Sequence, residues 1–227
     1  MKITHCIFDM DGLLLDTERI YTEVTSGILA RFGQTYSWKL KSRLMGLLQH
    51  DADALLINET GIDMTVEEYS KERDKGLLER FPTIKLKPGV MRLVKHLKEH
   101  NVPMAVATSS LRNSFEIKST HLREFFSMFD GIVCGNDPGV KCGKPAPDIF
   151  LVASKEIGNP PVEKCLVFED AINGIQAAKN AGMNVVWVAH KGLAEVCPGD
   201  NGADEKLLSL EDFNPEKYGL PPFDDSL

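Results

Sequence analysis

Short apolar runs alternate with segments of helical periodicity along this chain. Five runs lack polar alternation and predict buried strands, at residues 4–8, 104–107, 131–134, 165–168 and 184–188. Such runs are typical of a parallel sheet covered on both faces. Helical patterns lie between several of them, at residues 90–97, 147–158 and 171–181. Strands that alternate with helices predict a doubly wound α/β fold.

One connection is too long for a simple crossover. About 70 residues separate Asp16 from Lys87, whereas a crossover between parallel strands needs only about a dozen. Residues 18–32 and 66–80 have helical patterns, and Thr65 with Glu68 forms a capping box before the second one. We therefore predict a small helical cap domain at residues 17–86, inserted into a core of residues 1–16 and 87–227.

The composition is that of a globular protein with an acidic surface. Of 227 residues, 43% are hydrophobic and 26% charged, and the formal net charge is -7. This charge argues against a nucleic acid polymer or an anionic membrane as partner. No stretch approaches the roughly 20 apolar residues of a membrane span, and acidic residues come too early for a signal peptide. A cytoplasmic monomer is the expectation.

The five cysteines do not form a recognisable framework. Their number is odd and no pair has the CxxC spacing, so neither a disulfide scaffold nor a structural zinc site is indicated. Cys6, Cys134 and Cys165 lie in apolar strand-like runs, which predicts buried free thiols rather than reactive ones.

Four polar clusters follow the ends of predicted strands. They are Asp9-Met10-Asp11-Gly12, Thr108-Ser109-Ser110, Lys144 in the loop after the third strand, and Glu169-Asp170. The carboxyl ends of parallel strands lie along one edge of a sheet, where ligands bind. We therefore expect these clusters to converge, and that convergence is more informative than any one of them.

The carboxylates in these clusters fit metal-assisted phosphoryl transfer. Asp9 can attack phosphorus and form an acyl-phosphate. Asp11 can protonate the leaving oxygen and then activate water. Oxygen ligands from Asp9, the Asp11 carbonyl and Asp170 suit Mg²⁺, which lets two anions approach each other.

The remaining groups can bind the phosphate. The hydroxyls and backbone N–H groups of Thr108 and Ser109 can donate to phosphate oxygens. Lys144 supplies a positive charge to the nucleophile and to the phosphate. Each cluster also has a structural interpretation, because Thr108 and Asp170 could cap helices and Lys144 could be a solvated loop residue. Taken together and in this order, the clusters favour the catalytic interpretation.

The chain resembles the haloacid dehalogenase-like hydrolase superfamily. The matching segments are Phe8 to Thr17, Ala107-Thr108-Ser109, Gly143 to Asp148, and Val167 to Ala171. The resemblance implies a Rossmann-like core with Asp9 as nucleophile, Asp11 as acid and base, and a helical cap. It also implies Mg²⁺ bound by Asp9, Asp11 and Asp170, with Glu169 as a direct or water-mediated ligand. The dehalogenases lack the second carboxylate, so Asp11 disfavours that reaction.

Further segments resemble the pseudouridine-5'-phosphatases and plant glycerol-3-phosphatases of this superfamily. These are residues 121–127, 135–138, 210–213 and 219–221. Two positions depart from that pattern: Leu47 stands where a basic residue is usual, and Asn136 where an acidic one is usual. The resemblance implies a small phosphomonoester as substrate, with a pseudouridine 5'-phosphate-like nucleotide favoured and glycerol 3-phosphate or a sugar phosphate as alternatives.

Two other functions compete with a phosphatase. A β-phosphoglucomutase-like phosphomutase is similar around residues 108–113, where Arg112 could meet a second phosphate. Leu47 and Leu48 disfavour it, because a bisphosphate needs basic groups in the cap. A non-catalytic binding protein on the same fold should have lost at least one of four residues, and this chain retains them all: Asp9, Asp11, Lys144 and Asp170.

Overall fold

A parallel sheet forms the centre of the molecule. The computed structural model describes residues 2–44 and 49–224. Its strands are β1 (His5–Phe8), β2 (Met104–Thr108), β3 (Gly131–Cys134), β4 (Cys165–Glu169), β5 (Asn184–Val188) and β6 (Glu205–Leu207). They are ordered β3-β2-β1-β4-β5-β6 and pair in parallel throughout. The predicted doubly wound α/β fold is confirmed, and each predicted strand lies within one residue of its place.

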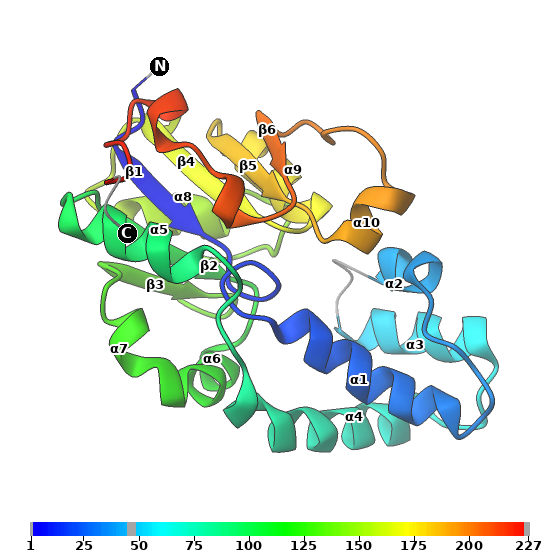
Figure 1. Ribbon diagram of the computed structural model, residues 1–227. Coiled ribbons are helices and arrows are strands. Elements are labelled where there is room, and N and C mark those ends of the chain that lie inside the picture. The colour runs from blue at the N-terminus through cyan, green and yellow to red at the C-terminus, as the bar shows by residue number, and fades with distance from the viewer. Residues whose placement is uncertain (1, 45–48, 225–227) are drawn as a thin grey trace.

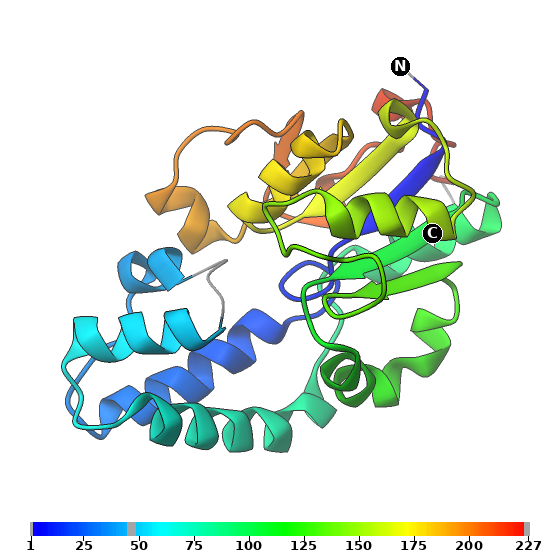
Figure 2. The same cartoon turned by 180° about the vertical axis from the view of Figure 1, so that it is seen from behind.

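Helices cover both faces of this sheet. On one face, α8 (Asp148–Glu156) and α9 (Ile172–Asn180) pack against the strands, as Figure 2 shows from behind. On the other face lie α5 (Val90–Glu99) and α7 (Arg123–Phe126), seen in Figure 1. The remaining helices of this part are α6 (Arg112–Ser119) and α10 (Lys191–Val196). The predicted helices correspond to α5, α8 and α9.

Alternate residues of each strand enter separate cores on the two faces. Phe8 and Phe168 point to one side, where their rings stack with centroids 4.7 Å apart. Ile7 and Val167 point to the other side, toward α8 and α9. This explains why the runs are apolar without alternation, because both faces of the strands are buried.

A helical segment follows β1. It comprises α1 (Thr17–Ala30), α2 (Trp38–Leu44), α3 (Gln49–Thr60) and α4 (Val66–Arg80). Figure 1 shows it beyond the carboxyl ends of the strands. The helix predicted at residues 18–32 corresponds to α1, and α4 has the predicted bounds. The predicted capping box is present, since Thr65 and Glu68 exchange side-chain and backbone hydrogen bonds.

Trp38 of α2 connects the helical segment to the sheet-bearing part. Its ring stacks on His190, with the centroids 4.4 Å apart. Gly192 at the start of α10 lies against the same indole, and a side chain at that position would overlap it. This contact between the two parts therefore combines an aromatic pair with a close backbone approach.

Three cysteines lie in the core as predicted. Cys6, Cys134 and Cys165 are buried free thiols. Burial raises the pKa of the Cys134 and Cys165 thiols to about 11, which disfavours the reactive thiolate. Of the helices within residues 2–44 and 49–224, none is long and apolar enough to cross a membrane.

Candidate active site

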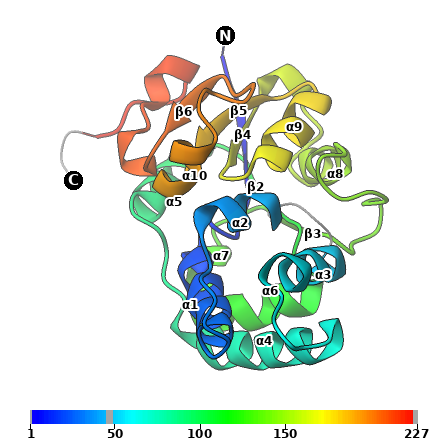
Figure 3. The ribbon, with the colours of Figure 1, turned by 90° about the vertical axis from the view of Figure 1, so that its right-hand side faces the viewer.

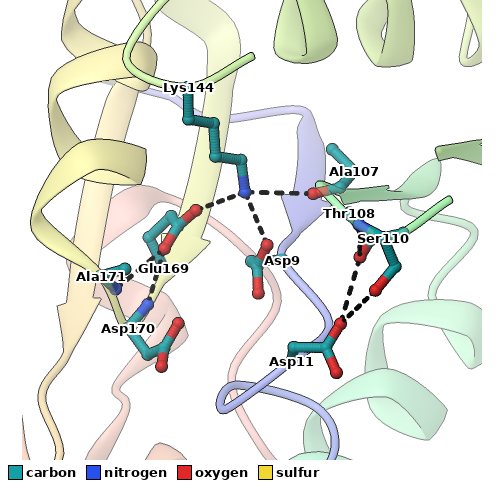
Figure 4. Close-up of polar contacts among 9 residues, drawn as sticks. All are labelled: Asp9, Asp11, Ala107, Thr108, Ser110, Lys144, Glu169, Asp170 and Ala171. Carbon is teal, nitrogen blue, oxygen red and sulfur yellow. Dashed lines mark hydrogen bonds and ion pairs between the residues drawn. The ribbon is translucent and has the colours of Figure 1, made fainter. Parts of the chain in front are cut away.

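The carboxyl edge of the sheet brings the predicted clusters together (Figure 4). Asp9 directly follows β1, Thr108 ends β2, and Glu169 ends β4. Because β1 lies between β2 and β4, these three ends are neighbours in space. The loop after β3 then carries Lys144 across the same edge. The predicted convergence of the clusters is therefore present in the structure.

Lys144 occupies the centre of this group. Its Nζ lies 2.6 Å from Oδ1 of Asp9, 2.5 Å from Oε1 of Glu169 and 3.3 Å from the carbonyl oxygen of Ala107. Burial alone would lower the pKa of Lys144, but the two carboxylates outweigh burial and raise the pKa above its ordinary value. Lys144 is therefore a fixed cation beside Asp9 rather than a solvated loop residue.

Three buried carboxylates form a candidate metal centre. One oxygen each from Asp9, Glu169 and Asp170 lies within 4.8 Å of the others. Burial raises the pKa of Asp9 to about 7, against the opposing effect of Lys144. Burial and the neighbouring carboxylates raise the pKa of Asp170 well above its usual range. Three carboxylates facing one ammonium are short of positive charge, so the donor set fits a hard divalent cation such as Mg²⁺.

Two glycines permit the close approach of these carboxylates. Gly12 has a φ of 89°, and a side chain there would overlap the Asp170 carboxylate. A side chain at Gly174 in α9 would overlap the carboxylate of Glu169. A larger residue at either position would displace a candidate metal ligand.

The carboxylate of Asp11 is bound separately from this cluster. Its Oδ2 accepts hydrogen bonds from Ser110 Oγ at 2.7 Å and Thr108 Oγ1 at 3.4 Å. Its Oδ1 lies 2.7 Å from Nζ of Lys118. Burial would raise the pKa of Asp11, but Lys118 and the hydrogen bond from Ser110 lower it. Two carboxyl groups two residues apart therefore occupy different electrostatic environments.

The comparisons with known proteins agree with this geometry. The family model described as haloacid dehalogenase-like hydrolase matches residues 6–188, a span that includes every cluster described above. The chain belongs to this family. The predicted family membership is thereby confirmed.

Named relatives of this haloacid dehalogenase-like hydrolase are phosphatases. (DL)-glycerol-3-phosphatase 2 of Arabidopsis thaliana is 48% identical over 99% of this chain and 95% of its own length. A probable pseudouridine-5'-phosphatase of Drosophila melanogaster is 45% identical over 99% and 97%. These relatives confirm the predicted enzyme class, a phosphatase of the haloacid dehalogenase-like family that acts on small phosphate esters.

Solved structures of the family have the same fold. A putative beta-phosphoglucomutase of Thermotoga maritima is 30% identical, with a TM-score of 0.69 over 91% of this chain and 94% of that one. A haloacid dehalogenase family hydrolase of Deinococcus radiodurans, solved with phosphate and sodium, has a TM-score of 0.77 over 97% and 98% at 22% identity. The second likeness concerns the fold alone.

Lys118 is a residue of the candidate site that could not be identified from the motifs in the sequence. It belongs to α6, its side chain is 1% exposed, and it contacts Asp11, Ser110 and Tyr21. The carboxylate of Asp11 raises the pKa of Lys118 against the opposing effect of burial. One signal was available: Lys118 comes three residues after the buried Phe115, on the apolar face of its helix.

Thr108 and Ser109, two of the three residues predicted to bind phosphate, differ in exposure. Thr108 is buried, and its Oγ1 accepts the N–H of Ser110 at 3.1 Å. Ser109 is exposed in the short loop before α6. Both lie at the carboxyl end of β2, on the side of Asp11.

Arg112 makes internal contacts in this hydrolase. Its guanidinium pairs with the carboxylate of Asp137 and donates to the carbonyl oxygen of Ile132 at 2.9 Å. The side-chain oxygen of Asn136 accepts the backbone N–H of Arg112 at 2.9 Å. Asn136 therefore stabilises the start of α6, where Arg112 lies. The position of Leu47 and Leu48, the other departure noted in the sequence, lies outside the described residues.

Asp170 is also connected to the sheet through its backbone. Its carbonyl oxygen accepts the indole N–H of Trp187 at 2.9 Å. Trp187 belongs to β5 and is fully buried. This bond ties the loop that bears Asp170 to the neighbouring strand.

Proposed function

We propose that this hydrolase is an Mg²⁺-dependent phosphatase that transfers a phosphoryl group to Asp9 and then to water. The observation that carries the proposal is that the buried Asp9 carboxylate contacts the Lys144 ammonium and also lies beside two further buried carboxylates, those of Glu169 and Asp170. A small phosphomonoester is the substrate, and a pseudouridine 5'-phosphate-like nucleotide is the favoured one.

Asp9 acts as the nucleophile in this proposal. Its carboxylate attacks phosphorus, the bond to the leaving oxygen breaks, and the phosphoryl group becomes an acyl-phosphate. Lys144 stabilises the carboxylate before attack and the negative charge of the phosphoryl group during it. Thr108 and Ser109 lie at the neighbouring strand end, where they can donate to phosphate oxygens.

Asp11 acts as the acid and then the base. It gives a proton to the leaving oxygen, and it later takes a proton from the water that hydrolyses the acyl-phosphate. Its contacts with Ser110 and Lys118 set it apart from the other carboxylates and favour its carboxylate form, which is the form that takes the proton from water.

Asp9, Glu169 and Asp170 would hold the Mg²⁺, and Asp11 would contribute through its backbone carbonyl. When bound, the ion neutralises phosphate charge and lets an anionic nucleophile approach an anionic substrate. Lys144 alone cannot offset three buried carboxylates and a phosphate, which supports the need for a further cation.

The helical segment is proposed to be a cap. We place its bounds at residues 17–86, over a core of residues 1–16 and 87–227, and propose that it covers the bound substrate and limits access of water. Its position beyond the carboxyl ends of the strands supports this role (Figure 1). We further propose that the protein acts as a monomer in the cytoplasm. Light scattering would measure its mass in solution and so test the oligomeric state.

Glycerol 3-phosphate is the second candidate substrate. The Arabidopsis thaliana glycerol-3-phosphatase and the Drosophila melanogaster pseudouridine-5'-phosphatase are nearly equally similar to this chain. The mutase alternative loses support because Arg112, its candidate ligand for a second phosphate, pairs with Asp137.

A phosphate-release panel tests the proposal. The purified protein with Mg²⁺ would be given pseudouridine 5'-phosphate, uridine 5'-phosphate, glycerol 3-phosphate and hexose phosphates, and kcat/KM would be compared. We expect phosphate release with the highest kcat/KM for pseudouridine 5'-phosphate. Isomerisation of a sugar 1-phosphate to the 6-phosphate without phosphate release would instead identify a mutase.

A further inference from the structure

Two histidines at the end of α5 and an aspartate near the C-terminus form a second group of metal-binding side chains. His96 lies in the last turn of α5, and His100 directly follows the helix. Their rings are neighbours, with the centroids 4.3 Å apart. One nitrogen of each ring and one carboxylate oxygen of Asp224 lie within 4.8 Å of one another. The three side chains can therefore reach a common ion.

Each imidazole is oriented by a hydrogen bond to a backbone carbonyl. Nε2 of His96 lies 3.0 Å from the carbonyl oxygen of Pro221, and Nδ1 of His100 lies 2.9 Å from that of His96. A carbonyl oxygen only accepts, so in the neutral rings these two nitrogens carry the hydrogen. Nδ1 of His96 and Nε2 of His100 are then the electron-pair donors. Metal-binding histidines are usually held in this way, by a hydrogen bond from the second nitrogen.

The segment that carries Asp224 is packed against α5. The ring of Phe223 lies 4.8 Å from that of His96 between centroids, and the Arg92 guanidinium lies 4.2 Å from the Phe223 centroid. The hydrogen bond between His96 and Pro221 fixes the same segment two residues earlier. The ligands are thus assembled by contacts that need no ion, which lowers the ordering cost of binding one.

This group lies away from the candidate active site. Helix α5 ends at Glu99 and β2 begins at Met104, so the histidines lie near the amino edge of the sheet. The carboxylates around Asp9 lie at the opposite, carboxyl edge. Figure 3 shows α5 and the red C-terminal segment on the same side of the sheet. An ion bound by the histidines would therefore be distinct from the Mg²⁺ proposed for the reaction.

We infer that His96, His100 and Asp224 bind a divalent transition-metal ion, and that Zn²⁺ is the ion that fits them. Zn²⁺ accepts two imidazoles and a carboxylate as ligands and can take water in a fourth position. Mg²⁺ prefers oxygen ligands, whereas two of the three ligands here are nitrogens. His100 and Asp224 are exposed, which gives the ion a route of entry. The bound ion would join α5 to the C-terminal segment and stabilise the folded chain.

Calorimetric titration of the full chain with Zn²⁺ in saturating Mg²⁺ tests the location, because Mg²⁺ competes at the carboxylates. We expect a Zn²⁺ site in the wild type whose Kd rises at least about tenfold in His100→Asn, since loss of an outer partner alone weakens metal binding by that factor. His50 of α3 is exposed and lies outside the group, so His50→Asn is the matched control and should retain the wild-type Kd. The absence of Zn²⁺ binding in the wild type, or an equal Kd in His100→Asn, would overturn the inference.

Thermal unfolding tests the contribution of Asp224. Zn²⁺ should raise the unfolding temperature of the wild type, and Asp224→Asn should show at most about half of that rise. The exposed Asp212 lies outside the group, so Asp212→Asn should show the full rise. An equal rise in Asp224→Asn and the wild type would overturn the assignment of this ligand. Phosphate release with Mg²⁺ alone should be unchanged in these variants, so the outcome does not depend on the proposed function.

Discussion

The ammonium of Lys118 lies 2.7 Å from the carboxylate of Asp11, although 107 positions separate the two residues in the chain. Lys118 is buried, and Asp11 is its carboxylate partner in the ion pair. The ion pair holds Asp11, the candidate general acid and base, in place at the carboxyl edge of the sheet. The orientation of Asp11 therefore depends on a residue of α6.

Lys118→Met should therefore lower kcat more than it raises KM. Without the ammonium, Asp11 loses one of its hydrogen bonds and its fixed orientation, and acid–base catalysis accounts for about 10² to 10⁴ in rate. We expect kcat for the preferred monophosphate to fall by about 100-fold, measured by phosphate release. Lys118→Arg retains the charge and should recover part of the loss. Equal activity of wild type and Lys118→Met would show that Asp11 needs no such partner.

Asp9→Asn should abolish turnover while the protein remains folded. The amide cannot act as a nucleophile toward phosphorus, and removal of a nucleophile costs about 10⁴-fold or more in kcat. Phosphate release would be compared with the far-ultraviolet circular dichroism of the same sample. A variant that retained one tenth of the wild-type kcat would contradict the assignment of Asp9.

Removal of Mg²⁺ should stop the reaction reversibly. EDTA is expected to abolish phosphate release and added Mg²⁺ to restore it, because the three buried carboxylates need a cation. Mg²⁺ should also raise the thermal unfolding temperature of the wild type, since a bound ligand stabilises the folded state. Asp170→Asn should show a much smaller rise. Full activity in EDTA would overturn the metal assignment.

Asp130 should stabilise the fold in a pH-dependent manner. Its carboxylate accepts the Met104 N–H and the Lys98 ammonium, both at 2.9 Å. Burial opposes these contacts, but together they lower the pKa of Asp130. Because the folded pKa is below the unfolded value of about 4, the stabilisation is present above that pH and is lost as the pH falls through the folded pKa.

Urea unfolding of wild type and Asp130→Asn would measure this effect. We expect a difference in the free energy of unfolding of about 1 kcal/mol at pH 7, because the ion pair is partly exposed and screened. The difference should shrink below about pH 4. The exposed Asp212 provides a control, and Asp212→Asn should show no such trend. A constant difference from pH 7 to pH 3 would contradict the proposed role of the carboxylate.

The strands and most of the candidate site could be predicted from the sequence because each depends on a pattern within a short segment. Apolar runs identify β1 to β5 because burial on both faces leaves no polar positions. Asp9, Thr108 and Glu169 were predictable as a group because parallel strands end along a common edge. Lys144 was predicted to join them from its place in the loop after the third strand, although that loop position gives no local sign of burial.

Two of the parts that were missed, β6 and α3, lack such local signals, and Lys118 shows only its place on the apolar face of α6. The edge strand β6 (Glu205–Leu207) has three partly exposed residues, two of them charged, so its pattern is that of a loop. Helix α3 contains buried Asp53, which removes the apolar stripe by which a helix is identified. The buried ammonium of Lys118 is neutralised by Asp11, which lies far away in the chain. A pairing between distant residues cannot be derived from the neighbourhood of either one.

The stacking of Trp38 on His190 makes the intrinsic fluorescence of Trp38 sensitive to the position of α2. The sequence contains two tryptophans, and the other one, Trp187, donates its indole N–H to the loop that bears Asp170. Trp38 would change its emission if α2 moved away from His190, while Trp187 would respond to changes around Asp170. Single-tryptophan variants would therefore separate the motion of the helical segment from events at the carboxylates, in real time and without an added dye.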